Sequence, residues 1–196
     1  MRLRLILAIV AGLGVGAATE LSVRHLPDSL SPIGNSAGPW ILVAFVMALT
    51  APRLSESLLL GLVTLIALVV GFYVAQANRG WAVSHHQVVF WSLASLVAGP
   101  LVGLSAGWLR HAGRTAGAAG AGVLGGVLVG EALHGITKLQ YSTPARYWHV
   151  QLVVGVGLAV GLALWRARRH PASALAASLV VCAVVGVCTL VAYQAP

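Results

Sequence analysis

The sequence predicts an all-α protein that crosses a membrane several times as a bundle of helices. Hydrophobic residues make up 59% of the 196 residues and charged residues only 8%, whereas a soluble domain has about a quarter charged residues. The apolar runs are long, and most approach the roughly 20 residues that a helix needs to span a bilayer. Because a bilayer admits only helices and closed barrels, such unbroken runs favour helices.

Seven apolar runs predict seven spans within a single membrane domain, with six spans as the alternative because the second run is short. Polar or proline-containing segments separate the runs, as expected for loops at the two membrane surfaces. The predicted spans cover residues 3–21, 39–51, 57–77, 88–109, 117–135, 148–165 and 172–193.

The first run has two interpretations. Arg2 and Arg4 ahead of an apolar stretch, with small residues at positions 17 and 18, fit a secretory signal peptide. The alternative is an uncleaved first span, which we favour because the chain that follows is itself membrane-embedded. Ala8, Gly12 and Gly16 recur every fourth residue, and such a stripe of small residues lets two helices pack closely in a bilayer.

The second and fourth runs have features of their own. Residues 39–51 are few for a complete crossing, so this helix either inserts thinly or packs wholly inside the bundle. Gly99 and Pro100 stand in the middle of the fourth run. Proline removes a backbone hydrogen bond there, so we expect a kink that can act as a hinge.

The last three runs carry clear helix signals. Gly122, Gly126 and Gly130 form a second stripe of small residues, which again predicts close packing of helices. The sixth run ends in a group of arginines after Trp165, and Pro171 then fits the first turn of a seventh helix.

The positions of the basic residues predict the orientation. With the N-terminus inside, more basic residues fall in cytoplasmic segments than in outer segments, as the positive-inside rule requires. The abundance of Ala, Gly, Val and Arg favours a bacterial source, so we predict a multi-pass protein of the bacterial inner membrane with its C-terminus outside. The cytoplasmic set is Arg2, Arg4, Arg53, Arg110, Arg114, Arg166, Arg168 and Arg169, and the outer set is Arg24, Arg79, Lys138 and Arg146.

The sequence has a weak repeating pattern of helical hairpins, which begin near Arg4, Arg53 and Arg114. Each hairpin consists of an outward helix, a polar loop and a return helix. Internal repetition would explain this repeating pattern. The positive-inside rule alone also explains it, because any series of hairpins that obeys the rule looks alike.

The candidate site residues gather on the predicted outer side. Glu131 follows a long uncharged stretch, and His134 lies on the same helix face three residues later. Ionisable groups at membrane depth are costly, so they indicate either a ligand site or a structural ion pair. Lys138, Arg146 and Arg79 are the cations available for such a pair.

Other residues on that side extend the candidate site. Its acids and histidines could hold a divalent cation of unknown identity or relay a proton, and its aromatic residues could wall a ligand. The alternative is the polar and aromatic belt found at membrane surfaces. The ligand-binding candidates are Glu131, His134, His86, His149, Glu20, Tyr141 and Trp148, and Trp81, Trp91 and Tyr147 could add to the walls.

Three classes of function remain. The basic residues do not form a stripe for nucleic acid, and no catalytic or nucleotide-binding motif is present, so we assign no catalytic residue and no cofactor. The first class is a protein that binds or transports a small molecule from the outer face, in a pocket among the first, fourth, fifth and sixth helices with Glu131 and His134 at its base. The second is an accessory subunit that contacts a membrane partner or another copy of itself. The third is an enzyme that acts on a lipid or isoprenoid.

The stretch Asn35-Ser-Ala-Gly-Pro-Trp-Ile-Leu-Val-Ala-Phe, with the hairpins downstream, resembles a family of small bacterial integral membrane proteins of unknown function. The resemblance covers most of the chain and implies a multi-pass protein without assigning an activity. The stripe in the first helix, the long first outer loop and the Gly-Pro-Trp start of the second span are similar to the substrate-binding S components of energy-coupling factor transporters. Those proteins have six spans with both ends inside, and this similarity implies substrate binding.

Overall fold

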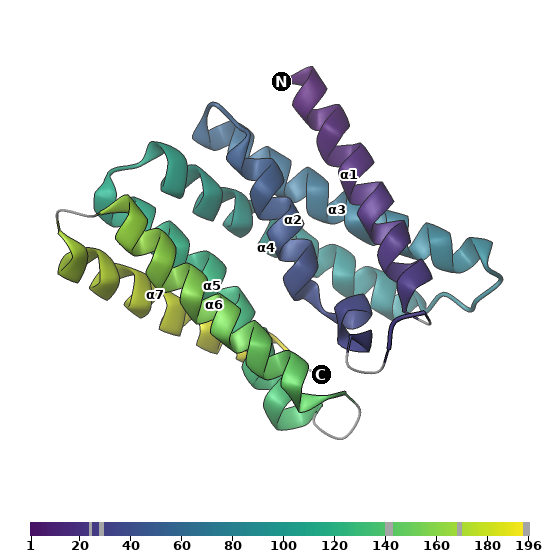
Figure 1. Cartoon of the computed structure of the whole chain (residues 1–196). Coiled ribbons are helices and arrows are strands. Elements are labelled where there is room, and N and C mark those ends of the chain that lie inside the picture. The colour runs from purple at the N-terminus through teal and green to yellow at the C-terminus, as the bar shows by residue number, and fades with distance from the viewer. Residues whose placement is uncertain (24, 28–29, 140–142, 168–169, 194–196) are drawn as a thin grey trace. The chain divides into compact units, whose positions relative to one another are not determined.

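The computed structural model describes residues 1–23, 25–27, 30–139, 143–167 and 170–193, which are helical apart from short turns and contain no strand. A short 3-10 helix, η1 (Ser31–Asn35), precedes α2. Each predicted span corresponds to one α-helix, which confirms the all-α fold class (Figure 1). The helices are α1 (Arg2–Ser22), α2 (Ala37–Leu49), α3 (Leu54–Asn78), α4 (His85–His111), α5 (Arg114–Lys138), α6 (Ala145–Arg166) and α7 (Pro171–Ala192).

Six of the described helices are long and apolar enough to cross a membrane, and α2 is the exception. Its 13 residues rise about 20 Å, whereas the hydrocarbon core of a bilayer is roughly 30 Å thick. Ser36 fixes where α2 begins, because its hydroxyl accepts a hydrogen bond from the Gly38 amide at 3.2 Å. At the other end of the chain, Pro171 occupies the first turn of α7, as its fixed φ favours.

The chain forms two compact units. Unit 1 comprises residues 1–27 and 33–104, and unit 2 comprises residues 28–32 and 105–196. The boundary falls within α4, so that most of this helix belongs to unit 1 and its last turns to unit 2. Each unit is described by itself below. The single membrane domain stays a prediction.

In unit 1, α1 packs on α3 along a seam of small residues. Ala8 is fully buried and is followed by the buried glycines Gly12 and Gly16. A Cβ atom on Gly12 would lie 2.8 Å from the Thr64 carbonyl oxygen, and one on Gly16 would lie 2.9 Å from the Phe72 amide nitrogen. The two backbones therefore touch, which only glycine permits. These are the three residues of the stripe seen in the sequence.

The unit 1 part of α4 packs on α3 through glycine as well. A Cβ on Gly99 would lie 2.6 Å from the Leu62 Cα, and one on Gly103 would lie 2.6 Å from the Leu58 Cα. Pro100 lies inside α4, and the helix continues past it. Gly99 thus has a packing role against α3, and its use as a hinge with Pro100 stays a prediction.

In unit 2, α5 is the central helix and packs on both α6 and α7, as Figure 1 shows. Its 18-residue apolar segment is 72% buried, far more than that of any other spanning helix. Gly122, Gly126 and Gly130 all face the backbone of α7, whereas Gly125 faces Gly155 on α6. The glycines of α5 thus serve two faces, and the stripe seen in the sequence is the face toward α7.

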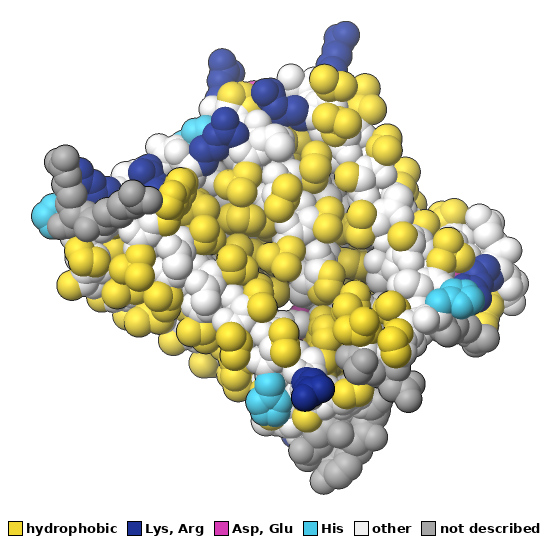
Figure 2. All heavy atoms as spheres, viewed as in Figure 1, with side chains coloured by type: hydrophobic (Ala, Val, Ile, Leu, Met, Phe, Trp, Pro, Cys, Tyr) yellow, Lys and Arg dark blue, Asp and Glu magenta, His cyan; other side chains and the backbone are white. Residues whose placement is uncertain are grey.

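The outward faces of the helices are apolar. Figure 2 shows hydrophobic side chains spread over the visible surface, with lysine and arginine gathered toward its margins. Leu93 and Val97 of α4, Val153 of α6 and Val187 of α7 are each more than half exposed. An exposed apolar surface of this kind is what a helix presents to lipid.

Candidate functional site

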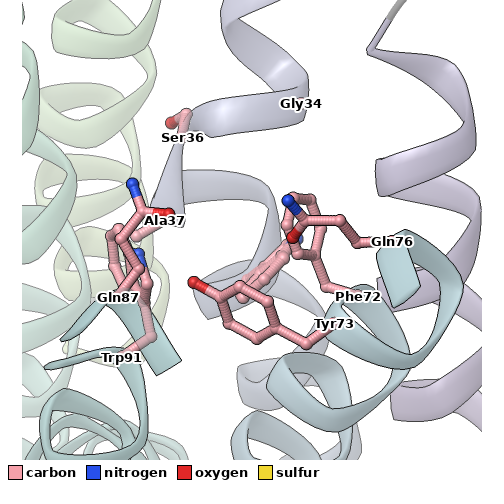
Figure 3. A pocket seen from close by; sticks show the side chains of 9 residues that line it. Gly34, Ser36, Ala37, Phe72, Tyr73, Gln76, Gln87 and Trp91 are labelled. Atoms are coloured by element: carbon pink, nitrogen blue, oxygen red, sulfur yellow. The ribbon is translucent and has the colours of Figure 1, made fainter. Parts of the chain in front are cut away.

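Unit 1 contains a pocket where the start of α2, the end of α3 and the start of α4 meet (Figure 3). We call it the aromatic pocket, and its volume is about 180 Å³. On the orientation predicted from the basic residues, this end of the unit faces outward. The pocket is lined by Gly34, Ser36, Ala37, Trp40, Phe72, Tyr73, Gln76, Gln87 and Trp91.

The aromatic rings of the pocket hold one another in place. The Trp40 ring lies between Phe72, with ring centroids 5.6 Å apart, and Trp91, at 6.5 Å. Phe72 in turn meets Tyr73 edge to face at 5.3 Å. The indole N–H of Trp40 donates a hydrogen bond to the Thr19 hydroxyl of α1 at 3.3 Å. Tilted and edge-to-face contacts of this kind are favourable, so three helices contribute to one preformed wall.

Two carboxamides supply the hydrogen-bonding capacity of the pocket. Gln76 of α3 donates from Nε2 to the Ala82 carbonyl oxygen at 3.2 Å, which fixes the orientation of its amide. Its Oε1 atom is buried and has no hydrogen-bond partner in the described part of the chain. In Figure 3 the Gln76 and Gln87 amides come from opposite sides of the pocket, with the Tyr73 hydroxyl between them. The pocket thus presents an unsatisfied acceptor.

An ion pair lies at the same end of unit 1. Arg79, the residue that follows α3, donates from Nη1 to Glu20 Oε2 at 3.4 Å, and Glu20 is buried near the end of α1. The guanidinium also lies 5.9 Å from the centroid of the Trp81 ring. Glu20, a predicted ligand-binding residue, therefore joins the end of α1 to the end of α3.

Glu131 lies in a second polar cluster, within unit 2. It is 3% exposed. Gln151 of α6 donates from Nε2 to Glu131 Oε2 at 2.8 Å, and the Tyr193 hydroxyl, just beyond α7, donates to Glu131 Oε1 at 3.2 Å. Three helices of the unit thus converge on one buried carboxyl group, and its contacts include two neutral donors.

The neighbouring His134 stacks on the Tyr193 ring, with centroids 5.0 Å apart and planes inclined by 24°. Its Nδ1 atom is buried and has no hydrogen-bond partner among the described residues. Burial, and after it the Glu131 carboxylate, raises the pKa of Tyr193 well above its usual value. The phenol therefore keeps its proton and remains a hydrogen-bond donor. We call Glu131, His134, Gln151 and Tyr193 the Glu131 cluster.

Trp148, another predicted ligand-binding residue, is buried in unit 2. Its indole ring lies directly on Gly135 of α5, where any Cβ would overlap the ring. Its N–H donates to the Thr143 hydroxyl at 2.8 Å, and Tyr147 meets the ring edge to face at 4.9 Å. Trp148 therefore packs against α5 at Gly135.

The remaining predicted residues lie apart from these clusters or outside the described chain. His86 is exposed at the start of α4, and His149 is exposed on α6, where its Nδ1 atom lies 2.7 Å from the Ala145 carbonyl oxygen. Tyr141 lies outside the described residues. Across the described residues, no three His, Cys, Asp or Glu side chains gather as metal ligands would. The pocket expected among four helices would join both units and stays a prediction.

Sequence reasoning missed several residues that the structure brings together. Phe72 was counted only as part of an apolar span, and Trp40 was noted at the start of the second span but was not proposed as a ligand-binding residue. Tyr193 is the last residue of the seventh predicted span, which ends on the same predicted side as Glu131, and this shared side was the signal that could have joined them. Trp91 was considered for a ligand wall, and it lines the aromatic pocket.

Comparison with known proteins places the chain in a family. Searches of curated proteins and of solved structures found no match. The sequence model of DUF6518, a family of unknown function, matches residues 1–195. Because this match covers nearly the whole chain, the protein belongs to the DUF6518 family.

Proposed function

We propose that the protein binds a small, uncharged, single-ring molecule in the aromatic pocket, from the outer face of a bacterial inner membrane, as a binding or transport protein. The observation that carries this proposal is the lining of the pocket, which combines four aromatic side chains with two carboxamides. Apolar walls with a few placed polar groups are the usual composition of a small-molecule site.

The lining favours a neutral ring over a charged ligand. None of the lining residues carries a charge at neutral pH, and an ion moved from water into such surroundings would lose its hydration without a paired charge. Trp40, Phe72 and Trp91 present ring faces and edges, against which a planar ring packs well.

The volume of the pocket and the unsatisfied Oε1 atom of Gln76 restrict further the kind of ligand that fits. A volume of about 180 Å³ is slightly larger than the roughly 150 Å³ apolar cavity known to hold benzene in an engineered protein. Oε1 of Gln76 is a buried acceptor, and leaving such an atom unsatisfied costs about 1–3 kcal/mol. A ligand with an O–H or N–H donor removes this cost. Phenol, which has one ring and one donor, is therefore the simplest probe.

The test is the thermal unfolding of the purified full-length protein with phenol, toluene or benzoate. Phenol at ten times its Kd should stabilise the protein by about 1.4 kcal/mol. Toluene, which lacks the donor, should bind more weakly, and benzoate, which is charged, should have no effect. Gln76→Leu should remove the preference for phenol over toluene, because it removes the acceptor.

Trp165→Phe is the matched control, since Trp165 lies on α6 of the other unit, is 59% exposed and does not line the pocket. It should leave the phenol effect unchanged, whereas Trp91→Ala should abolish it. Equal stabilisation by all three compounds, or a phenol effect that survives Trp91→Ala, would contradict the proposal.

A further inference from the structure

One end of unit 2 carries three arginines that the fold brings together. The connection from α4 to α5 lies beside the end of α6, because Arg166 Nη2 donates a hydrogen bond to the Ala112 carbonyl oxygen at 2.6 Å. Arg110 in the last turn of α4 and Arg114 at the start of α5 flank Ala112 in the chain, and both are exposed. We call Arg110, Arg114 and Arg166 the arginine cluster.

The helices of unit 2 place no carboxylate at this end. Residues 57–196 contain a single acidic side chain, that of Glu131. Glu131 lies on α5 about 25 Å from Arg114 along the helix axis, since each residue of an α-helix rises about 1.5 Å. The arginine cluster is therefore a concentration of positive charge that no acid of these helices neutralises.

The Arg166 side chain is held against the first turns of α5. A Cβ on Gly117 would lie 2.9 Å from Arg166 Cγ and 3.0 Å from its Nε, so the glycine leaves the room that this side chain occupies. The Nε atom is buried there and has no hydrogen-bond partner in the described part of the chain. A guanidinium has five N–H donors, and the described acceptor is one neutral carbonyl oxygen.

This position is electrostatically unfavourable without an anion. A basic residue in the last turn of α6 suits the negative end of its own helix, but the Arg166 side chain extends instead to the positive end of α5. The N-cap of α5, Gly113, supplies no side-chain acceptor for the amides of the first turn. An anion at this point would compensate both the guanidinium and the end of α5, and the planar fork of arginine matches the oxygens of a phosphate.

The adjacent residue indicates where such a phosphate comes from. Trp165 is 59% exposed at the end of α6, and tryptophan in a membrane protein gathers at the level of the lipid head groups. Further along α6, Val153 presents an exposed apolar side chain of the kind that faces lipid. The arginine cluster thus lies at the depth of the lipid phosphates, with an apolar helix face below it for an acyl chain.

We propose that the arginine cluster binds the phosphate of an anionic phospholipid, whose acyl chains lie along the outward face of α6. Clusters of basic residues beside membrane helices are typical sites for anionic head groups. The proposal requires only that this end of unit 2 lies at a membrane surface. It is therefore independent of ligand binding in the aromatic pocket and of which side of the membrane this end occupies.

The test is the quenching of tryptophan fluorescence by brominated lipids, with the full-length protein in phosphatidylcholine vesicles that contain one tenth phosphatidylglycerol. Either lipid is brominated near the top of its acyl chains, and the signal of Trp165 is the difference between the wild type and Trp165→Phe. At equal mole fraction, brominated phosphatidylglycerol should quench Trp165 several-fold more than brominated phosphatidylcholine. Equal quenching by the two lipids would overturn the proposal.

Three substitutions of arginine by glutamine separate a site from a general attraction by net charge. Arg166→Gln and Arg114→Gln should each lower the relative binding constant for phosphatidylglycerol about fivefold, the usual effect of one basic residue at an anionic surface. Arg53→Gln removes the same charge from an exposed position of unit 1 and should have no effect. Arg114 is exposed, so its variant keeps the test decisive if Arg166→Gln fails to fold.

Two results would contradict the proposed lipid site. An equal loss in Arg53→Gln would show that net charge alone attracts the lipid, and a preference that survives both substitutions in the cluster would show that the cluster does not bind it. Inorganic phosphate, exchanged for chloride at constant ionic strength, tests the source of the phosphate group. It should leave the preference unchanged, whereas its loss would mean that the site takes the free anion and not the lipid.

Discussion

Replacing Gly16 by alanine tests the seam on which unit 1 is built. A Cβ at this position would overlap the Leu68 carbonyl oxygen and lie 2.9 Å from the Phe72 amide nitrogen. Both are backbone atoms of α3 and cannot rotate aside, so α1 would have to move. Overpacking of this kind costs about 1–3 kcal/mol, against a gain of about 1 kcal/mol in helix propensity.

Gly14→Ala is the matched control on the same helix. Nothing lies within 4 Å of a Cβ at Gly14, so only the gain in propensity remains. We expect Gly16→Ala to unfold more easily than Gly14→Ala by about 2 kcal/mol, with Gly14→Ala at or above the wild-type stability. Reversible unfolding in mixed detergent micelles, followed by circular dichroism, measures this difference. Equal stability of the two variants would refute the contact between the backbones of α1 and α3.

Three further predictions concern unit 2 and the orientation. Gly126→Ala should lower the free energy of unfolding by about 1–2 kcal/mol relative to Gly157→Ala, whose Cβ would meet nothing within 4 Å. If the two variants unfold at the same temperature, α5 does not pack on α7 at Gly126. Gly135→Ala should displace the indole packed on it and shift its fluorescence to the red, whereas an unchanged spectrum would mean that no such contact exists. Lys138→Cys should react with an impermeant maleimide added outside cells and Ala112→Cys only after lysis, and the reverse pattern would invert the assumed orientation.

Much of the fold could be predicted because the bilayer constrains the chain so strongly. Every helix that crosses the bilayer had to be an apolar run of suitable length, and turn residues such as Pro171 mark where runs begin. The stripe at Gly122, Gly126 and Gly130 was visible from its spacing, which identifies one face of a helix. The partner of that face was not visible, because most helices of this chain present similar small and apolar residues. Only the fold shows that the face packs on α7.

The hairpin pattern in the sequence left two explanations open, internal repetition and the positive-inside rule alone. The repeating pattern in the sequence indicated hairpins that begin near Arg4, Arg53 and Arg114, because arginines at helix ends are the most regular feature of the sequence. In the structure, α2 packs mainly on α3 in unit 1, whereas α6 packs mainly on α5 in unit 2, so internal repetition stays a prediction. What the two units share is a first helix with buried small residues, Ala8 and Gly12 on α1 and Ala118 and Gly122 on α5.

The candidate site was predictable in part for a similar reason. A carboxylate after a long uncharged stretch is costly in a membrane, so Glu131 was identified from its position alone. Its contact with Tyr193 joins residues far apart in the sequence, and only the packing of α7 on α5 brings them together. The aromatic pocket likewise depends on how α2 packs on α3, because Trp40 and Phe72 have no special spacing in the chain.

The most direct test of the central claim, that the aromatic pocket binds a small neutral ring, is a fluorine NMR titration with phenol. The protein would be labelled with fluorotryptophan, and the resonances of Trp40, Trp91 and Trp165 assigned by replacing each with phenylalanine. The account expects phenol to shift the Trp40 and Trp91 resonances saturably and to leave Trp165 unchanged. A saturable shift confined to the exposed Trp165, or no saturable shift at all, would contradict it.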